Sequence, residues 1–393
     1  MEEKRKAFIL NGDTYSGLQI SRSLGQRDIP IVTFTFPGEK FGPSKYITKT
    51  IDYKEKDSLL ATLQKYGQRE KKKPVLFPTE ESHIPFLLEH EKELKYYYIF
   101  PGEKMGNWKA FINYEKAKGF ARSFGIPTPE EISVKDENLP GFISSFSYPY
   151  LGIDENRQEK FKIHNKKDLA QYLEMASKDK KDYKILRRIP GATNGIYTFH
   201  GYFGEHSELM AYGIYRQMKR NNPYFGEPIM VQQCWNPKIY EFSKSIVQEG
   251  HYRGYVECTF KEDPTTQNTY LLSIQLSFGP YLKFFKALDV DFPYLYYLDA
   301  QGLTLDHEKK FLNYQKGIYG KVWKFDEEDS TESSKFLKPI FPRKIGGLWD
   351  PKDPGPALTF ISNKIQKKLT NILTTLLNLW KKYRPKKKRA PIE

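Results

Sequence analysis

The sequence contains little cysteine and histidine, which excludes several kinds of site. Among 393 residues there are two cysteines, Cys234 and Cys258, and seven histidines. Two cysteines build no disulfide framework, and neither residue type shows the spacing of a metal-ligand set. The histidines also lack the Ser/His/Asp arrangement of a nucleophilic hydrolase. We therefore expect a reducing, cytoplasmic setting.

Long apolar runs are also missing. No stretch approaches the roughly 18 uninterrupted apolar residues that a membrane-spanning helix needs. The charged segment 1–6 leads directly into AFIL at 7–10, which is too short for the apolar core of a signal peptide. With 39% hydrophobic and 15% aromatic residues the chain can build a packed core, and its length suggests two or three domains. The composition therefore predicts a globular protein.

The first hundred residues alternate strand and helix patterns but lack a dinucleotide fingerprint. The strand-like segments AFIL (7–10) and VLFPT (75–79) are each followed by a loop and a helix-like segment. This alternation predicts a parallel sheet covered on both faces, with loops 11–17 and 78–83 at its ligand-binding edge. The glycines of loop 11–17 are not spaced G-x-G-x-x-G, so an ordinary turn explains them equally well.

Beyond residue 100 the pattern changes to an α+β arrangement. Helices are predicted over 108–125, 166–177 and 239–250, with aromatic-rich antiparallel strands from 198 onward. We therefore divide the chain into an N-terminal domain, a central domain and a C-terminal segment. Their bounds are 1–100, 101–340 and 341–393.

A predicted hairpin at 254–279, GYVECTFKEDPTTQNTYLLSIQLSFG, has one apolar and one polar face. Period-2 alternation separates Val256, Cys258 and Phe260 from the polar residues of the first strand. Antiparallel sheets commonly leave one face in water, so a solvated polar face and a ligand-binding face both fit the pattern. The polar face carries Glu257, Thr259 and Lys261 on the first strand and Ser273, Gln275 and Ser277 on the second.

Several segments, in their order along the chain, carry a family resemblance. They are GLQISRSLGQRDIPIV (17–32), VLFPTEESHIPFL (75–87), LRRIPGATNGIYTFHGY (186–202), YRQMKRNNPYFG (215–226), the hairpin and GGLWDPKDPGPAL (346–358). This order resembles the ATP-grasp superfamily, most closely its stand-alone carboxylate-amine ligase-like members. The resemblance implies a parallel-sheet domain followed by two α+β lobes, divided near 190–200, with ATP between them. It also implies that ATP phosphorylates a small carboxylate and that an amine captures the acyl-phosphate.

In that family the polar face of the hairpin binds magnesium through a Glu on the first strand and Glu, Asn and often Arg on the second. The matching positions here are Thr259, Ser273, Gln275 and Ser277, with Glu257 two residues before Thr259. Magnesium on a nucleotide needs one or two carboxylates, whereas Thr, Ser and Gln offer only dipoles. The resemblance therefore leaves Glu257 and Gln275 as a weak metal site, and a solvated Glu257 is the alternative.

The resemblance also indicates lysines that contact phosphates. The first lysine position of the family falls at Tyr114, and Lys116 is close enough to replace it. The second falls in PYLGID (149–154), which has no lysine, so Lys160 and Lys162 just downstream are the candidates. The alternative is that these lysines are simply solvated.

Two basic segments complete the expected nucleotide and substrate site. LRRIPG matches the strand that lines the adenine pocket, where Arg187 and Arg188 point to opposite faces. Gly191 belongs to a segment that fits either a backbone nest for phosphate or a mobile turn. Arg216 falls in the basic loop near the acyl-phosphate, and its planar fork makes it the predicted catalytic anion-binding residue. A solvated basic loop is the alternative.

The net charge of +15 is concentrated near the C-terminus. Residues 340–393 contain thirteen Lys and Arg against three acids, a net +10. Because nucleic-acid-binding domains usually carry a basic stripe on the folded core, sequence-specific nucleic-acid binding is not expected. Apolar residues recur at steps of three and four from Ile361 to Tyr383, which predicts an amphipathic helix. Residues 357–389 either dock on the protein body, lie on an anionic membrane surface or bind nucleic-acid phosphates without specificity.

Two functions fit these patterns. The preserved order of segments favours an ATP-dependent carboxylate-amine ligase that uses ATP and magnesium on a small carboxylate and an amine. The missing acids instead favour a catalytically degenerate ATP-grasp protein that binds a ligand or a partner. Under this second hypothesis the protein would be cytoplasmic, and its C-terminal tail would bind it peripherally to a membrane.

Overall fold

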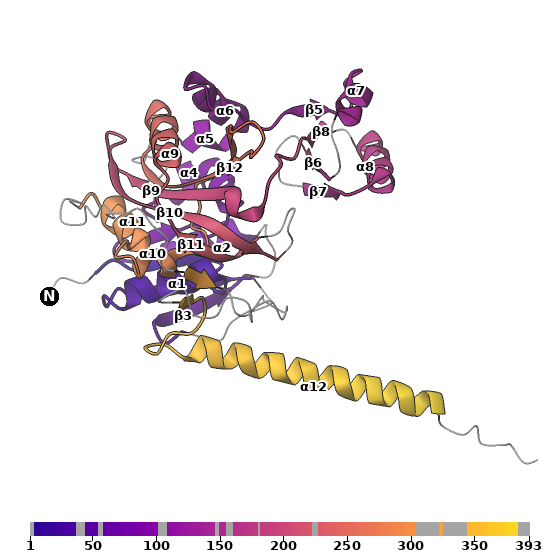
Figure 1. Cartoon of the computed structure of the whole chain (residues 1–393). Coiled ribbons are helices and arrows are strands. Elements are labelled where there is room, and N and C mark those ends of the chain that lie inside the picture. Colours follow the sequence, from indigo (N-terminus) through magenta and orange to yellow (C-terminus); the bar gives the residue numbers. More distant parts are fainter. Residues whose placement is uncertain are drawn as a thin grey trace, which may run out of the picture.

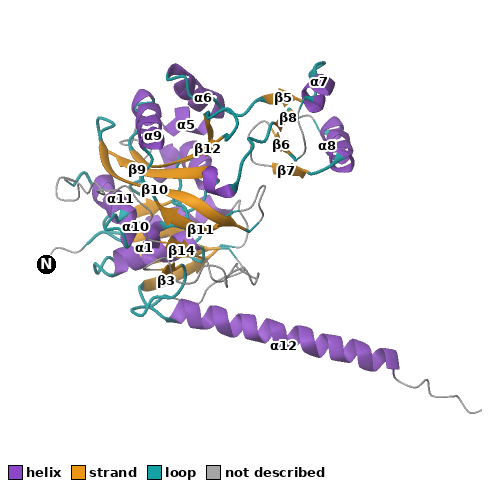
Figure 2. Ribbon diagram, viewed as in Figure 1, coloured by secondary structure: helices purple, strands orange, loops and turns teal. Residues whose placement is uncertain are grey.

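The structure, a computed structural model, describes residues 4–36, 44–53, 58–100, 108–145, 149–154, 160–179, 181–221, 227–303, 322–324 and 344–383. The described strands form three sheets. Helices surround the sheets, and one long helix projects away from the rest of the chain (Figure 1). Helices and strands both contribute throughout (Figure 2). A parallel sheet and largely antiparallel sheets occur in one molecule, which confirms the predicted combination of α/β and α+β architecture.

The N-terminal sheet is parallel, as the alternation of strands and helices predicted. Its strands are β1 (Ala7–Leu10), β2 (Ile31–Thr35), β3 (Ile47–Asp52) and β4 (Val75–Phe77), and the helices around it are α1 (Tyr15–Gly25), α2 (Leu59–Gly67), α3 (His83–Glu89) and α4 (Glu91–Leu94). The strand order is β3-β2-β1-β4. Ala7 and Ile9 share a core with α1, and Phe8 and Leu10 share another with α2. Both faces are therefore buried, which explains why β1 is apolar throughout.

The largest sheet contains the predicted hairpin at one edge. Its strands are β9 (Ile196–Phe203), β10 (Leu209–Arg220), β11 (Pro228–Gln233), β12 (Gly254–Glu262), β13 (Thr269–Gln275), β14 (Val322–Lys324) and β15 (Lys344–Gly346). The order is β13-β12-β9-β10-β11-β14-β15, and only β14 and β15 run parallel to each other. In the hairpin, Glu257 lies opposite Gln275 and Thr259 lies opposite Ser273.

Helices cover both faces of this large sheet. They are α5 (Trp108–Ile112), α6 (Tyr114–Ser123) and α9 (Pro237–Glu249) on one face, and α10 (Leu282–Lys286) and α11 (Phe292–Ala300) on the other. The single helix predicted over 108–125 is wrong, because α5 ends at Ile112 and α6 begins at Tyr114. Asn113 between them has an extended backbone, and its side chain accepts the Lys116 N–H as a helix cap.

A small lobe stands apart from the large sheet (Figure 1). It contains β5 (Glu131–Ser133), β6 (Tyr150–Asp154), β7 (Lys160–Ile163) and β8 (Tyr183–Leu186) with α7 (Leu139–Ser144) and α8 (Lys166–Lys178). The antiparallel order is β5-β8-β6-β7, and Tyr150, Tyr172 and Tyr183 belong to a core of its own. The chain leaves the lobe after Leu186, passes a 3₁₀ turn at Thr193–Gly195 and enters the large sheet at Ile196.

The C-terminal segment returns to the N-terminal domain before its last helix. Arg22 of α1 forms a buried ion pair with Asp353, with Nε 2.9 Å from Oδ2, and donates to the Leu348 carbonyl at 2.8 Å. Helix α12 (Gly355–Tyr383) follows, and its Ala357 packs against Leu18 and Leu348. The expected docking of this helix on the body therefore involves its first turns. No helix among the described residues is long and apolar enough to cross a membrane.

Candidate functional site

The polar face of the hairpin is covered. Glu257 is only 8% exposed and Lys261 only 7%, so the interpretation of Glu257 as a solvated strand carboxylate is wrong. Thr198 on the neighbouring strand β9 lies opposite Thr259, and their hydroxyl oxygens are 3.3 Å apart. A row of small hydroxyl groups therefore continues across three strands through Ser273.

Glu257 lies in an environment that disfavours its charge. Burial, together with the nearby carboxylates of Glu227 and Glu81, raises its pKa to about 8. Its Oε2 lies 3.6 Å from Nδ1 of His200, but burial keeps the pKa of that imidazole well below its usual value. At neutral pH the pair is therefore mostly a neutral acid beside a neutral imidazole.

The residues on this face do not fit a magnesium ion well. A metal-ligating carboxylate must be deprotonated, so an ion would have to displace the proton that Glu257 carries near neutral pH. Gln275, directly opposite, adds one amide oxygen without charge. The described part of the chain contains no group of three or more His, Cys, Asp or Glu residues that could hold a metal. The proposed Glu257 and Gln275 metal site therefore stays a prediction that the local electrostatics do not favour.

Three cations meet farther along the same face of β12. Lys261 donates from Nζ to the carbonyl oxygen of Gly191 at 3.1 Å. Burial and the charges of Arg188 and Arg220 lower the pKa of Lys261 to about 8, against an opposing effect of Asp263. Residue 188 comes from the link after β8, residue 220 ends β10 and residue 261 lies on β12. Three separate elements thus gather positive charge at the junction between the small lobe and the large sheet.

A bulge explains how Arg220 reaches this face. Along β10, Tyr215 pairs with Thr198 and Arg216 with Tyr197, so strict alternation would place residues 216 and 220 on the same face. The pairing of β10 with β11 shifts register between Gln217 and Arg220. Such a bulge re-aims the residues after it. Arg220 accordingly interacts electrostatically with Glu227, Tyr281, Tyr215 and Arg188.

Arg216 itself lies on the opposite face from Glu257 and Thr259. Its Nε and Nη2 both donate to Gln232 Oε1, at 2.9 and 2.7 Å. The structure therefore does not bring the predicted catalytic arginine to the cation cluster of Arg188, Arg220 and Lys261. Its role as the catalytic anion-binding residue stays a prediction.

The other predicted nucleotide-binding residues are dispersed. Gly191 lies at the cation cluster, whereas Arg187 faces Glu130, with Nη1 3.5 Å from Oε1. Lys116 is exposed on α6, and Lys162 is exposed on β7, where Lys160 also lies. These lysine assignments stay predictions.

Sequence reasoning missed a buried lysine between α6 and the small lobe. Lys118 is 4% exposed, and its Nζ lies 2.9 Å from Glu131 Oε1 and 2.7 Å from Glu115 Oε1. Lys184 of β8 also pairs with Glu131, at 3.2 Å. The spacing of Glu115 and Lys118 along one helix was visible in the sequence, but the pairing across the lobe boundary was not.

The N-terminal loops at the predicted ligand edge do meet. Asn11 donates from Nδ2 to Glu80 Oε1 at 2.8 Å and accepts the Tyr53 hydroxyl at 2.6 Å. Burial raises the Tyr53 pKa to about 12, helped by the charges of Glu80 and Asp13. Glu81 reaches the end of the hairpin, where Oε1 accepts the backbone N–H groups of residues 276 and 277 at 2.8 Å each. The N-terminal domain therefore borders the polar face of the hairpin.

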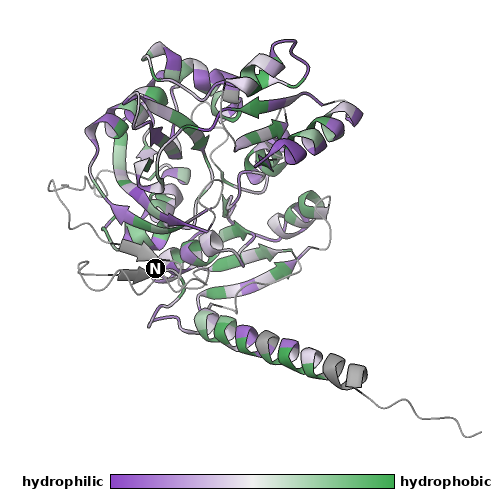
Figure 3. Cartoon of the chain, turned by 45° about the vertical axis from the view of Figure 1, so that its right-hand side comes forward, coloured by the Kyte–Doolittle hydropathy of each residue, from purple (hydrophilic) through white to green (hydrophobic). Residues whose placement is uncertain are grey.

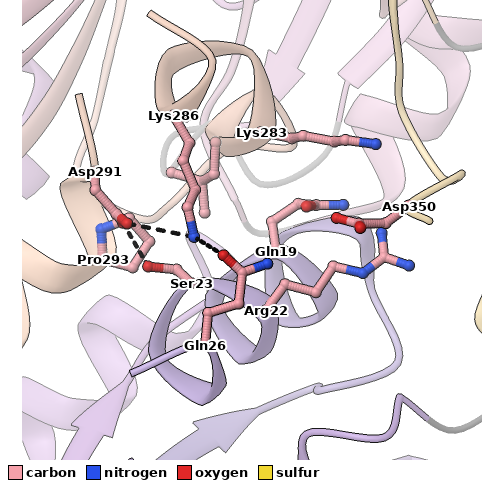
Figure 4. Close-up of a pocket in the computed structure, with 10 residues that line it drawn as sticks. Gln19, Arg22, Ser23, Gln26, Lys283, Lys286, Asp291, Pro293 and Asp350 are labelled. Carbon is pink, nitrogen blue, oxygen red and sulfur yellow. Dashed lines mark hydrogen bonds and ion pairs between the residues drawn. The ribbon is translucent and has the colours of Figure 1, made fainter. Parts of the chain in front are cut away.

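Two cavities among the described residues lie away from this face. One of about 30 Å³ lies between α1 and α10, where Lys286 contacts Asp291 and Gln26 (Figure 4), and it is too small for a nucleotide. A second, of about 350 Å³, lies between the N-terminal sheet and α2, lined by Phe8, Tyr66 and Arg69 among others. The cation cluster lines neither of these two cavities.

Comparisons with known proteins agree with this architecture. No family model matches the sequence. A D-aspartate ligase of Enterococcus faecium (strain Aus0004) is 21% identical over 243 residues, which cover 55% of this chain and 56% of that protein. The chain thus matches only about half the length of this curated relative.

Solved structures show the fold. N5-carboxyaminoimidazole synthetase from Staphylococcus aureus, complexed with ADP, matches with a TM-score of 0.59 and 16% identity over 77% of this chain and 79% of that chain. L-amino acid ligase from Bacillus licheniformis matches with a TM-score of 0.56 and 12% identity over 77% and 75%. Biotin carboxylase from Campylobacter jejuni matches with a TM-score of 0.59 and 11% identity over 77% of this chain and 72% of that chain. The chain has the ATP-grasp fold, as the order of its segments indicated.

Proposed function

We propose that this chain is an ATP-grasp protein that binds the phosphate groups of a nucleotide between its lobes, mainly through protein cations rather than through magnesium. The observation that carries the proposal is the cluster of Arg188, Arg220 and Lys261 beside the Thr198 and Thr259 hydroxyls. These three positive charges repel one another in a partly buried site. A bound polyanion would relieve that repulsion.

The neutral state of Glu257 supports binding without magnesium. At neutral pH a protonated carboxyl beside the hydroxyl row donates a hydrogen bond and repels no phosphate oxygen. Arg188 and Arg220 present planar forks that suit phosphate oxygens, and Lys261 supplies a point charge. The chain would thus neutralise phosphate with three cations where a metal-dependent site relies on carboxylates and an ion.

Calorimetric titration with ADP and ATP, with magnesium and with a chelator, tests the binding. We expect comparable affinity in both conditions and a loss of about tenfold or more in Arg188→Met, since a charge-assisted phosphate contact is removed. Arg122→Met is the control, because it removes one exposed cation from helix α6, outside the cation cluster. No binding in any condition, or equal losses in both variants, would contradict the proposal.

A second candidate function is ligation of a small carboxylate to an amine. It is favoured by the relatives named D-aspartate ligase and L-amino acid ligase, although the match to the first covers about half of each chain. The protein residues would position the reactants and neutralise charge, with no nucleophilic side chain required. Phosphate release from ATP over a panel of amino acids that includes D-aspartate tests it. Release no faster than with ATP alone would identify a catalytically degenerate binding protein.

We also propose that the protein is cytoplasmic. Both cysteines are free thiols: Cys258 is buried in the core, and Cys234 is partly buried. Burial raises the pKa of Cys234 to about 12, so this thiol is protonated and unreactive at neutral pH.

A further inference from the structure

Helix α12 exposes an apolar stripe along much of its length. Ile365 and Leu373 are 56% and 59% exposed, and the other apolar residues of the stripe are similar. The stripe comprises Leu358, Ile361, Ile365, Leu369, Ile372, Leu373 and Leu376. In Figure 3 green apolar positions recur along the projecting helix. So much apolar surface on one exposed element indicates an interaction site.

The helix is attached to the body at one end. Ala357 is 3% exposed against Leu18 and Leu348, and the ion pair of Arg22 with Asp353 holds the segment just before it. The remainder extends away from the body (Figure 1). A helix of 29 residues is about 43 Å long. Helix α12 therefore presents a long amphipathic surface rather than a short docking motif.

The spacing of the stripe departs from that of a left-handed coiled coil. From Ile361 the apolar residues follow at steps of four, four, three and four to Leu376, so residues 361 and 372 are eleven apart. A left-handed coiled coil needs a seven-residue repeat of alternating three and four. An eleven-residue repeat keeps its stripe nearly straight along a regular helix. Such a stripe fits a planar surface, or a right-handed pairing with a second copy of the helix.

The positive charge of the helix favours an anionic partner surface. Between Gly355 and Tyr383 the sequence has five lysines and neither Asp nor Glu. Paired copies of the helix would bring lysines together without an acid to offset them. An anionic lipid surface attracts the lysines while the apolar stripe enters the headgroup region. We propose that α12 binds peripherally to an anionic phospholipid bilayer and holds the ATP-grasp body at its surface.

Sedimentation of the full chain with vesicles tests the proposal. We expect pelleting with mixed phosphatidylcholine and phosphatidylglycerol vesicles, weakened by salt, and little pelleting with phosphatidylcholine alone. Ile365→Ser with Leu369→Ser should weaken partitioning by about tenfold or more. Leu303→Ser is the matched control, because Leu303 is 51% exposed but lies outside the helix. Circular dichroism verifies that each variant is folded.

Other partners of α12 give distinct results. Equal pelleting with neutral and anionic vesicles, or equal pelleting of the double variant and wild type, would overturn the proposal. A dimer in light scattering that Ile365→Ser dissociates, with no vesicle binding, would assign the stripe to a second copy. Binding of duplex DNA that the apolar substitutions leave unchanged, again without vesicle binding, would assign the lysines to nucleic-acid phosphates.

Discussion

At the scale of single residues, β12 carries two groups of opposite type that both favour their neutral forms. Glu257 has its pKa raised to about 8 and Lys261 has its pKa lowered to about 8, and burial is the first cause in each. Near pH 7 the acid is mostly protonated and the lysine is mostly charged. Protonated Glu257 therefore adds no negative charge to the face on which charged Lys261 lies.

The raised pKa of Glu257 predicts a pH-dependent stability. Between its unfolded pKa and about 8 the native state binds more protons than the unfolded state, so stability falls as pH rises through this window. His200, kept neutral by burial, acts in the opposite direction only below its usual value of 6.5. Between about pH 6.5 and 8, Glu257→Gln should flatten the decline and stabilise the protein at pH 8 by about 1–3 kcal/mol. Urea denaturation at several pH values measures the free energy of unfolding, with a substitution at an exposed acid, Glu249→Gln, as control. If stability falls with pH as steeply in Glu257→Gln as in the wild type, the interpretation of Glu257 as a buried, protonated carboxyl is contradicted.

The lowered pKa of Lys261 predicts a pH-dependent affinity. A nucleotide phosphate favours charged lysine, so binding should weaken as pH rises above about 8. Lys261→Arg keeps its charge at these pH values and should bind with nearly constant affinity from about pH 7.5 to 9. Calorimetric titration with ADP measures both proteins. The same decline in the two would show that Lys261 does not contact the phosphate.

At the scale of elements, local capping explains where helices begin. Asn165 precedes α8, and its Oδ1 accepts the N–H groups of Lys167 and Asp168 at 2.9 and 3.0 Å. Asn165→Ala should destabilise the helix by about 1 kcal/mol. Asn138 precedes α7 but its side chain makes no cap hydrogen bond, so Asn138→Ala is the matched control. Hydrogen exchange of the α8 and α7 amides measures both, and equal losses of protection would argue against the cap.

At the scale of the whole molecule, a buried ion pair joins helix α1 to the segment just before α12. Arg22 and Asp353 are 2% and 1% exposed, and Asp353 also accepts the Ser44 hydroxyl at 2.7 Å. Asp353→Asn leaves a buried guanidinium without a carboxylate and should cost about 3–5 kcal/mol. Chemical denaturation measures the loss, with Asp350→Asn as the control at a more exposed acid. A loss below about 1 kcal/mol would mean that this segment contributes little to holding α12.

Much of the architecture could be read from local patterns. The continuous apolar run at 7–10 predicted a buried parallel strand, and the alternation at 254–279 predicted a hairpin with a distinct polar face. Both patterns depend on side-chain direction, which repeats every two residues in a strand and needs no partner to be recognised. The order of the segments then indicated the ATP-grasp fold.

The composition of the site depended on contacts between distant segments. Whether the polar face met water was decided by the helices and aromatic side chains that cover Glu257. The sequence is interpreted as a basic loop at Arg216, but the structure continues strand β10 to Arg220, and a bulge in its pairing with β11 brings Arg220 rather than Arg216 to Lys261. Residue order specifies which way a regular strand points its side chains, whereas long-range pairing sets where that regularity breaks and which charges become neighbours.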